Sequence, residues 1–292
     1  MRFAWIKRHD EEFPVAVMCK VLQVSDSGYY SRLKYEPSAS QQRRQTIAQA
    51  AARFYFESQR IYGYRKIYED LHQANIECCR ETVRRIMRQN GLFSRVKRRF
   101  VRTTDSNHNM AVAQNLLDRD FTADAVNTKW AADITYIPTQ EGWLYLAAVM
   151  DLYSRRIIGW SMSENIDSKL VTEALRMAIS QRKPQTGLVH HSDRGSQYAS
   201  DDFQDLLVDN GIVCSMSRRG NCWDNACMES FFGSFKMEWM RDKKYVSFDE
   251  AKKDVFKYVE IFYNRRRRHA SLGYVSPVAY EEISENERKQ VA

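Results

Sequence analysis

Apolar residues recur at helical spacing in the first part of the chain, between short polar turns. Within residues 13–34, Val17, Val21 and Leu22 lie at helical spacing, and a turn follows them at residues 23–27. This spacing gathers them on one face of a helix. We therefore predict two short helices around a turn, a weak helix-turn-helix signal, in an N-terminal helical segment covering residues 1–40.

A stronger helical pattern follows this segment. Helices are predicted at 43–59, 64–73 and 80–90, the last two separated by a short turn. Gly91 comes directly after them and suits the left-handed conformation in which many helices end. Two helices around a short turn form a helix-turn-helix, so we place a helix-turn-helix-like DNA-binding domain at residues 41–102.

After Trp130 the apolar residues no longer recur at helical spacing but follow the pattern of β-strands. Three strands are predicted at 131–139, 143–152 and 155–163, and the short turns between them favour an antiparallel meander. Helices then alternate with strands, with helices at 168–181, 200–211 and 223–241 and strands at 187–193 and 212–217. This order predicts an α/β domain built on a mixed five-stranded sheet with helices on its faces.

Composition excludes several classes of protein. Hydrophobic residues make up 43% of the 292 residues, and Gly and Pro number only 11 and 5, which excludes collagen and low-complexity disorder. The longest apolar run, 143–150, is too short to span a bilayer, and the N-terminus lacks a signal-peptide pattern. The six cysteines form no C-x-x-C pair. We therefore expect a cytoplasmic protein with reduced thiols.

Positive charge is concentrated at the front of the chain. The net charge is +8, yet residues 1–110 contain 21 basic and 11 acidic side chains, a net of +10. The remaining 182 residues carry a net of −2. An excess of positive charge in one region allows a polyanionic partner there, so nucleic-acid binding is expected of the front half.

Three arginines follow one another at four-residue intervals in the last helix of the front half: Arg80, Arg84 and Arg88. They line a face beside the apolar residues of that helix, as in a recognition helix that enters a DNA groove. On spacing alone a solvated basic face is equally consistent. The basic run that follows, which contains Arg98 and Arg99, extends the positive strip and favours contacts with DNA phosphates.

Three carboxylates of the back half lie among apolar residues or at the end of a strand, where an unpaired charge is energetically costly. Asp133 is inside an otherwise apolar strand, Asp193 ends the fourth strand, and Glu229 lies in a helix among phenylalanines. Three acids without His or Cys ligands favour a hard ion such as Mg²⁺ or Mn²⁺ over zinc. Two such ions, about 3.5–4 Å apart, can activate an attacking hydroxyl and stabilise the leaving oxygen of a phosphoryl displacement.

Other polar residues nearby have simpler interpretations. Asp224 begins the long helix, where a carboxylate caps backbone amides, and Asp151 ends the second strand and is read as structural. His190 and His191 lie on a buried strand, so we interpret them as packing or supporting groups rather than as metal ligands.

Four segments of the back half resemble one family. WAADITYI, HHSDRGSQY, NCWDNACMESFFGSFK and YNRRRRHASLGYVSP are similar to the catalytic domain of insertion-sequence-three family transposases, the second-frame product, which is related to retroviral integrases. YGYRKIY and NGL extend the resemblance, so that it covers about residues 43–280. It implies a ribonuclease-H-like integrase core at 128–285, after a linker at 103–127.

The resemblance also implies roles for single residues. Asp133, Asp193 and Glu229 match the DDE triad of the family, with Asp133 expected to bridge two Mg²⁺ ions, for which Mn²⁺ can substitute. Lys236 matches a basic residue seven positions after the glutamate, and this spacing of almost two helical turns places it on the same face, where it can hold a phosphate. Cys227 is a departure, since many relatives have another small residue or proline there.

The arginine run 265–268 allows two interpretations, a solvated helix end or a contact with the DNA backbone. Because the run lies inside one of the resembling segments, we predict that Arg267 contacts DNA.

The predicted function is that of a DNA transposase of a bacterial insertion sequence, acting at the nucleoid. Metal-dependent hydrolysis would free a 3′-OH at the element end, which then attacks target DNA. The front half would bind the terminal inverted repeats, as part of a homo-oligomer, with the upstream-frame product of the family as an expected fusion partner. Two alternatives stay open, a non-catalytic DNA-binding regulator of transposition and a ribonuclease-H-type nuclease.

Overall fold

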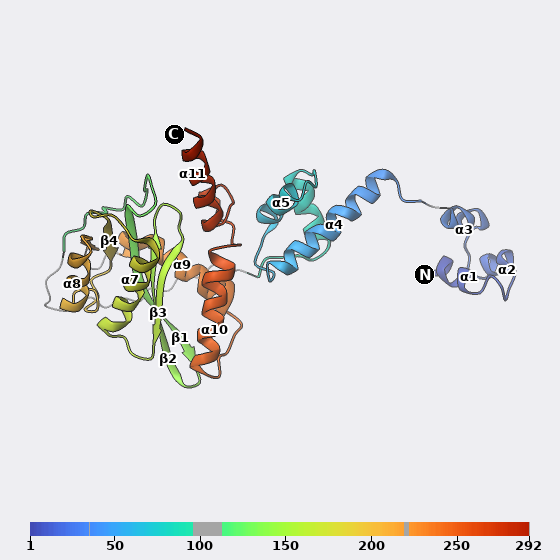
Figure 1. The fold of residues 1–292 in the computed structure, drawn as a ribbon. Helices are drawn as coiled ribbons and strands as arrows, with labels where there is room; N and C mark the ends of the chain where they lie inside the picture. Colours follow the sequence, from blue (N-terminus) through green and yellow to red (C-terminus); the bar gives the residue numbers. More distant parts are fainter. Residues whose placement is uncertain (35, 96–112, 219–221, 292) are drawn as a thin grey trace. The chain divides into compact units, whose positions relative to one another are not determined.

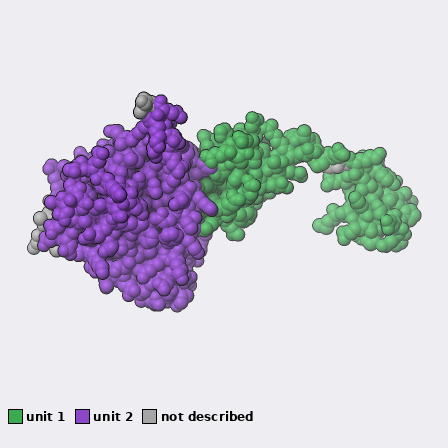
Figure 2. Space-filling model, viewed as in Figure 1, with its two compact units in different colours: residues 1–94 green, residues 95–292 purple. Residues whose placement is uncertain are grey.

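The computed structural model describes residues 1–34, 36–95, 113–218 and 222–291. The chain forms two compact units, residues 1–94 and residues 95–292, drawn in different colours in Figure 2. In the described ranges no helix is both long and apolar enough to cross a membrane.

The first three helices of the first unit share a small core. They are α1 (Arg2–Arg8), α2 (Val15–Val21) and α3 (Asp26–Leu33). Ile6, Met18 and Tyr29 are almost fully buried among them, whereas Val17 and Val21, whose spacing predicted the helix, are exposed. The Ser25 hydroxyl accepts a hydrogen bond from the Gly28 amide and thereby caps α3. The two helices predicted within 13–34 are confirmed.

Three longer helices complete the first unit: α4 (Ala39–Glu57), α5 (Tyr64–Gln73) and α6 (Arg80–Gln89). Helix α4 begins earlier than predicted because Ser38 and Gln41 form a capping box, which satisfies amides that would otherwise lack partners. After α6, Gly91 has a φ of 66°, the left-handed conformation expected of it. The three predicted helices are thus confirmed.

The second unit is built on a five-stranded sheet of order β3-β2-β1-β4-β5. Its strands are β1 (Lys129–Thr139), β2 (Gly142–Asp151), β3 (Ile157–Ser163), β4 (Val189–Ser192) and β5 (Val213–Met216). The first three pair antiparallel, whereas β4 pairs parallel with β1 and with β5. The predicted mixed sheet and its antiparallel meander are confirmed.

Helices α7 (Ser168–Arg182) and α8 (Asp201–Asp209) supply the helical side of the main core, and Figure 1 shows α7 lying along the sheet. Close packing of α7 depends on Gly159 of β3. A Cβ atom at this position would lie 2.2 Å from the Ala174 carbonyl oxygen and 2.7 Å from the Ala178 amide nitrogen. The glycine therefore permits direct contact between strand and helix backbone.

The opposite face of the sheet carries the C-terminal helices. The path begins with a 3-10 turn, η1 (Cys222–Asn225), and continues through α9 (Ala226–Ser234), a π-helical segment η2 (Phe235–Met240), α10 (Phe248–Phe256), a second π-helical segment η3 (Lys257–Tyr263), a short turn η4 (Ala270–Leu272) and α11 (Pro277–Val291). Buried aromatic rings hold this layer together, with Phe231 and Phe235 close to Tyr258. The helix predicted at 223–241 therefore exists, but it is divided among three helical types.

Candidate active site

The strand register places two of the predicted acids side by side. In the parallel pair, Ala131 of β1 lies opposite His191 of β4. Asp133 and Asp193 each come two residues after this pair. They therefore lie side by side on neighbouring strands, which are about 4.8 Å apart. Both side chains are half-buried. The end of β4 and the middle of β1 thus form the floor of one site.

Backbone amides fix the two aspartates. The Ile134 amide donates to Asp133 Oδ1 at 2.8 Å, and the Gly195 amide donates to Asp193 Oδ1 at 2.9 Å. A Cβ atom at Gly195 would lie 3.1 Å from the same carboxylate oxygen, so a larger residue there would shift the Asp193 carboxylate. These bonds orient both carboxylates without neutralising them.

The helical layer supplies the other two predicted residues. Glu229 lies exposed in the first turn of α9. The start of this helix is tied to β1, since the Asn225 amide group donates to the Ala132 carbonyl at 3.0 Å, one residue before Asp133. One and a half to two turns later, the Lys236 ammonium stands 4.4 Å from the centre of the Tyr136 ring of β1. These two contacts hold α9 and the π-helical segment η2 against β1, close to the two aspartates.

The electrostatics connect these four residues. Burial raises the pKa of Asp133 well above its usual range, the negative charges of Asp193 and Glu229 raise it further, and the Lys236 ammonium opposes them. The pKa of Lys236 is lowered by burial and partly restored by Asp133. Three like charges and one cation therefore act on one another at close range.

The chemistry of the three carboxylates suits a hard divalent ion. Within the described ranges, no three His, Cys, Asp or Glu side chains lie close enough together to hold a metal. The carboxylates of Asp133, Asp193 and Glu229 offer only oxygen, the ligand that Mg²⁺ and Mn²⁺ prefer. Their mutual repulsion is the kind of charge imbalance that a divalent cation relieves.

Tyr198 was not anticipated from the sequence. Its side chain is 1% exposed, and its hydroxyl has no hydrogen-bond partner among the described residues. Burial raises its pKa well above the usual range, and the charges of Asp133 and Asp193 add to this shift. The phenol packs in the core beside His190 and Phe203, within the electrostatic influence of the two aspartates. Its place five residues after Asp193 in HHSDRGSQY was the available signal.

The two histidines of β4 are packing groups, as interpreted. His190 is fully buried, its edge meets the Phe203 ring, and burial lowers its pKa to about 3. His191 hydrogen-bonds through both ring nitrogens to Ser215 at 2.8 Å and Ser217 at 3.1 Å, and burial lowers its pKa to about 4. Both are therefore neutral core residues.

Asp224 is not the helix cap that its position suggested. Its carboxylate is fully buried, and it accepts hydrogen bonds from the guanidinium groups of Arg218 and Arg119, at 2.9 and 3.1 Å. The Asn115 amide donates to it as well, at 3.0 Å. The cap interpretation was wrong because side chains outside the helix, Arg218 six residues earlier and the more distant Arg119 and Asn115, satisfy the carboxylate. Asp151 is structural as expected, since it accepts from the Asn127 and Tyr153 amides.

Arg267 has a protein partner that the sequence did not indicate. Its guanidinium makes a two-bond ion pair with Glu238, at 2.6 and 2.7 Å, and both side chains are buried, with 12% and 8% exposed. Ser234 accepts a further hydrogen bond at 3.1 Å. A guanidinium held in this way is turned into the protein, and its contact with DNA stays a prediction. A run of four arginines in the sequence gave no indication of which one points inward.

The arginines of α6 are exposed as predicted, and Val83, Ile86 and Met87 pack on its inner face. Arg80 pairs with Glu69 of α5 at 3.1 Å, and Arg84 pairs with Glu81 at 3.2 Å. Arg88 makes no ion pair within the described ranges. Their contact with DNA stays a prediction, and Arg98 and Arg99 lie outside the described residues.

Comparison with known proteins places the chain in a family. The profile described as "Integrase core domain" matches residues 123–222, a second profile of the same description matches residues 210–277, and an "HTH-like domain" matches residues 42–100. The chain is 42% identical to the insertion element IS600 uncharacterized 31 kDa protein of Shigella sonnei, over 91% of this chain and 97% of that one. It is 40% identical to the transposase InsF for insertion sequence IS3A of Escherichia coli (strain K12), over 96% and 98%.

Solved structures similar to this chain include the HTLV-2 integrase catalytic core domain in complex with magnesium, at 18% identity and a TM-score of 0.41, covering 53% of this chain and 96% of that one. A simian T-cell lymphotropic virus intasome, in complex with the PP2A regulatory subunit B56 gamma, matches at 14% identity and a TM-score of 0.46, covering 75% and 74%. From the identity to transposases over almost its full length, together with the integrase core and HTH-like domains, the chain belongs to the insertion-sequence-three family of DDE transposases.

Proposed function

We propose that the second unit cleaves and joins DNA at the ends of an insertion sequence, by divalent-metal-dependent hydrolysis followed by attack of the freed 3′-OH on a second phosphodiester. One observation carries this proposal: the register of the two central strands β1 and β4 sets Asp133 beside Asp193, and the bond from Asn225 to Ala132 brings the helical path of Glu229 and Lys236 to them. A phosphoryl-transfer site needs such a combination of oxygen ligands and a phosphate-binding cation.

The three carboxylates would hold two Mg²⁺ ions, with Mn²⁺ as a substitute. When bound, such ions supply activation of the attacking hydroxyl and stabilisation of the leaving oxygen. By its match to the first residue of the family's DDE triad, Asp133 would be the ligand shared by both ions. The Ile134 and Gly195 amides hold Asp133 and Asp193 in orientation, which limits the rearrangement needed for catalysis.

Lys236 would bind a DNA phosphate beside this site. Its ammonium lies against the Tyr136 ring, which keeps the long side chain from folding away. It is also subject to the negative charge of Asp133. A phosphate held there lies within reach of the carboxylates, so Lys236 would position the scissile strand.

The first unit would recognise the terminal inverted repeats through α6. Arg80, Arg84 and Arg88 are exposed on one side of a helix whose other side is buried, as a recognition helix requires. A homo-oligomer would then bring two element ends and target DNA together, with the upstream-frame product as a further partner.

The test is strand cleavage and joining by full-length Asp193→Asn on labelled element-end DNA in Mg²⁺. We expect the rate to fall by at least about a thousandfold, since one ligand of the ions is lost, while DNA binding is unchanged. Asp205→Asn, an exposed carboxylate of α8, is the matched control. Cleavage at the wild-type rate by Asp193→Asn would show that the triad is misassigned.

The same assay decides between the alternatives. Sequence-specific binding without any joining by the wild-type protein would indicate a regulator. Preferential cleavage of an RNA–DNA hybrid would indicate a ribonuclease-H-type nuclease.

A further inference from the structure

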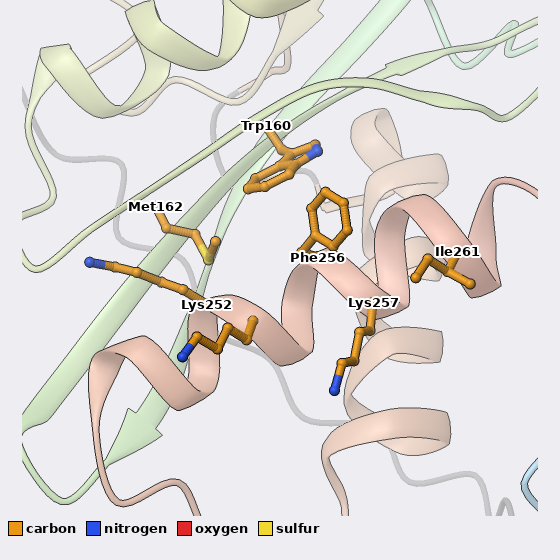
Figure 3. Close-up of a pocket in the computed structure, with 7 residues that line it drawn as sticks. Trp160, Met162, Lys252, Phe256, Lys257 and Ile261 are labelled. Atoms are coloured by element: carbon orange, nitrogen blue, oxygen red, sulfur yellow. The ribbon is translucent and has the colours of Figure 1, made fainter.

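An apolar groove of about 450 Å³ lies on the face of the sheet that carries the C-terminal helices. Trp160 and Met162 of the edge strand β3 form one side, and Phe256 and Ile261 of the α10–η3 path form the other. Figure 3 shows the rings of Trp160 and Phe256 close to each other at one end of this groove. Because β3 is an edge strand, no further strand covers this side of the groove.

The floor of the groove is unusually exposed for apolar residues. Phe256 is 47% exposed and Ile261 is 43% exposed. Trp160 is held in place, since its indole N–H donates to Glu260 Oε1 at 2.8 Å. A fixed aromatic ring between exposed apolar side chains is characteristic of a surface that another protein covers.

Three lysines, Lys252, Lys253 and Lys257, border the groove. None of them forms an ion pair with any described residue, in contrast to Lys243, which binds Asp254 at 2.7 Å. Lys253 and Lys257 are four residues apart on one helical path, where like charges repel. The rim therefore favours an occupant with negative charges flanking an apolar group.

A nucleic acid does not match this combination. Protein–DNA interfaces are more polar and wetter than protein–protein interfaces. Here the floor consists of Trp160, Met162, Phe256 and Ile261, and only the rim is cationic. An amphipathic helix with an apolar residue between acids matches both parts, in the helix-in-groove mode of recognition.

Helix α11 of this chain has that chemistry. Its outward face presents Ile283, which is 46% exposed, and the neighbouring acids Glu282 and Glu287. Neither acid forms an ion pair with a residue that the structure describes. The face therefore offers an apolar residue flanked by unpaired negative charge, the complement of the groove.

The α11 helix of the same chain is held away from the groove. Glu281 accepts from Ser154 and Arg156 at 2.7 Å and from Arg182 at 2.6 Å, which anchors α11 beside the residues that precede β3. The lone exposed isoleucine on its outer face does not enter the groove of its own chain, whose lining includes Met162 near the other end of the strand. An α11 that occupies the groove must therefore come from another copy.

We propose that the groove binds α11 of a second copy of this chain, with Ile283 seated between Trp160 and Phe256 and with Glu282 and Glu287 facing the lysine rim. The contact links catalytic units to one another in the absence of DNA. It does not depend on the metal site.

A charge-swap experiment on the full-length protein tests this contact, with sedimentation velocity in the absence of DNA as the measurement. One variant is Lys253→Glu with Lys257→Glu, and the other is Glu282→Lys with Glu287→Lys. Each variant alone places like charges across the contact, so its self-association should weaken at least about tenfold. An equimolar mixture of the two pairs opposite charges again and should restore association.

Lys169→Glu and Glu173→Lys, exposed residues of α7 on the other face of the sheet, are the matched controls and should associate as the wild type does. The proposal is overturned if the wild type is monomeric, if the mixture does not recover association, or if the groove variant associates normally but binds DNA more weakly. The last result would identify the groove as a DNA-binding surface.

Discussion

The buried ion pair between Glu238 and Arg267 allows a quantitative prediction. Arg267 donates to both carboxylate oxygens, at 2.6 and 2.7 Å, and to Ser234, and only about a tenth of either charged side chain is exposed. The substitution Arg267→Met removes the charge and keeps most of the volume. It leaves Glu238 buried without its cation.

The expected loss of stability follows from this burial. Removing one partner of a buried, doubly hydrogen-bonded pair costs about 3–5 kcal/mol, because the remaining charge is desolvated without compensation. Domains are stable by about 5–15 kcal/mol, so the loss is a large part of the total. The double variant Glu238→Met with Arg267→Met removes both charges and should recover most of the loss, since no unpaired charge then stays buried.

Urea unfolding of the full-length protein, followed by tryptophan fluorescence, measures these differences. Of the six tryptophans only Trp5 precedes the second unit, and Trp239 packs in the same aromatic layer as the ion pair. Arg265→Met is the control, because Arg265 is exposed in the same run and should change the unfolding free energy by less than about 0.5 kcal/mol.

One result would refute the reasoning. Suppose that Arg267→Met unfolds at the same urea concentration as the wild type, but binds DNA more weakly and with an affinity that depends less on salt. The guanidinium then binds DNA and does not stabilise Glu238. Equal instability of the double and single variants would separately show that the site cannot repack around apolar residues.

Three further predictions concern the core and the first unit. Gly159→Ala should lower the unfolding free energy by about 3 kcal/mol in urea titrations, because the added methyl collides with the α7 backbone; an unchanged midpoint would contradict the close packing. In the folded protein His190 is neutral, because its pKa is lowered from 6.5 to about 3. Its contribution to the free energy of unfolding is therefore complete above pH 6.5 and is lost as the pH falls toward 3. The loss is at most about 1.4 kcal/mol per pH unit. His190→Leu should flatten this dependence between pH 6.5 and 4, since neither ring nitrogen has a partner to lose; an equally steep dependence in the variant would exclude His190 as the cause. Arg88→Ala should weaken binding to element-end DNA and reduce the slope of log affinity against log salt by about 1, whereas Arg176→Ala on α7 should not; an unchanged slope for Arg88→Ala would remove that residue from the interface.

Local patterns predicted the elements of this fold well because each pattern reflects a face that must be buried. The helices of the first unit and the strands of the sheet follow the periods of their apolar residues. Asp133 and Glu229 also stood out locally, since a charge among apolar neighbours requires a partner. The cap predicted at Asp224 failed and the ion pair of Arg267 was not foreseen, because both charged residues bond to side chains of other elements.

The sequence by itself determined the kinds of elements, their order, the family and the residues that carry the proposed chemistry. Only the tertiary structure decided which charges meet. The register of β1 and β4 brings Asp133 beside Asp193, and the tie from Asn225 to β1 brings Glu229 and Lys236 to them. The same packing buries Arg267 and leaves the lysine-rimmed groove open. Spacing along a chain fixes which face a side chain is on, whereas the partner across that face depends on elements that are far apart in sequence.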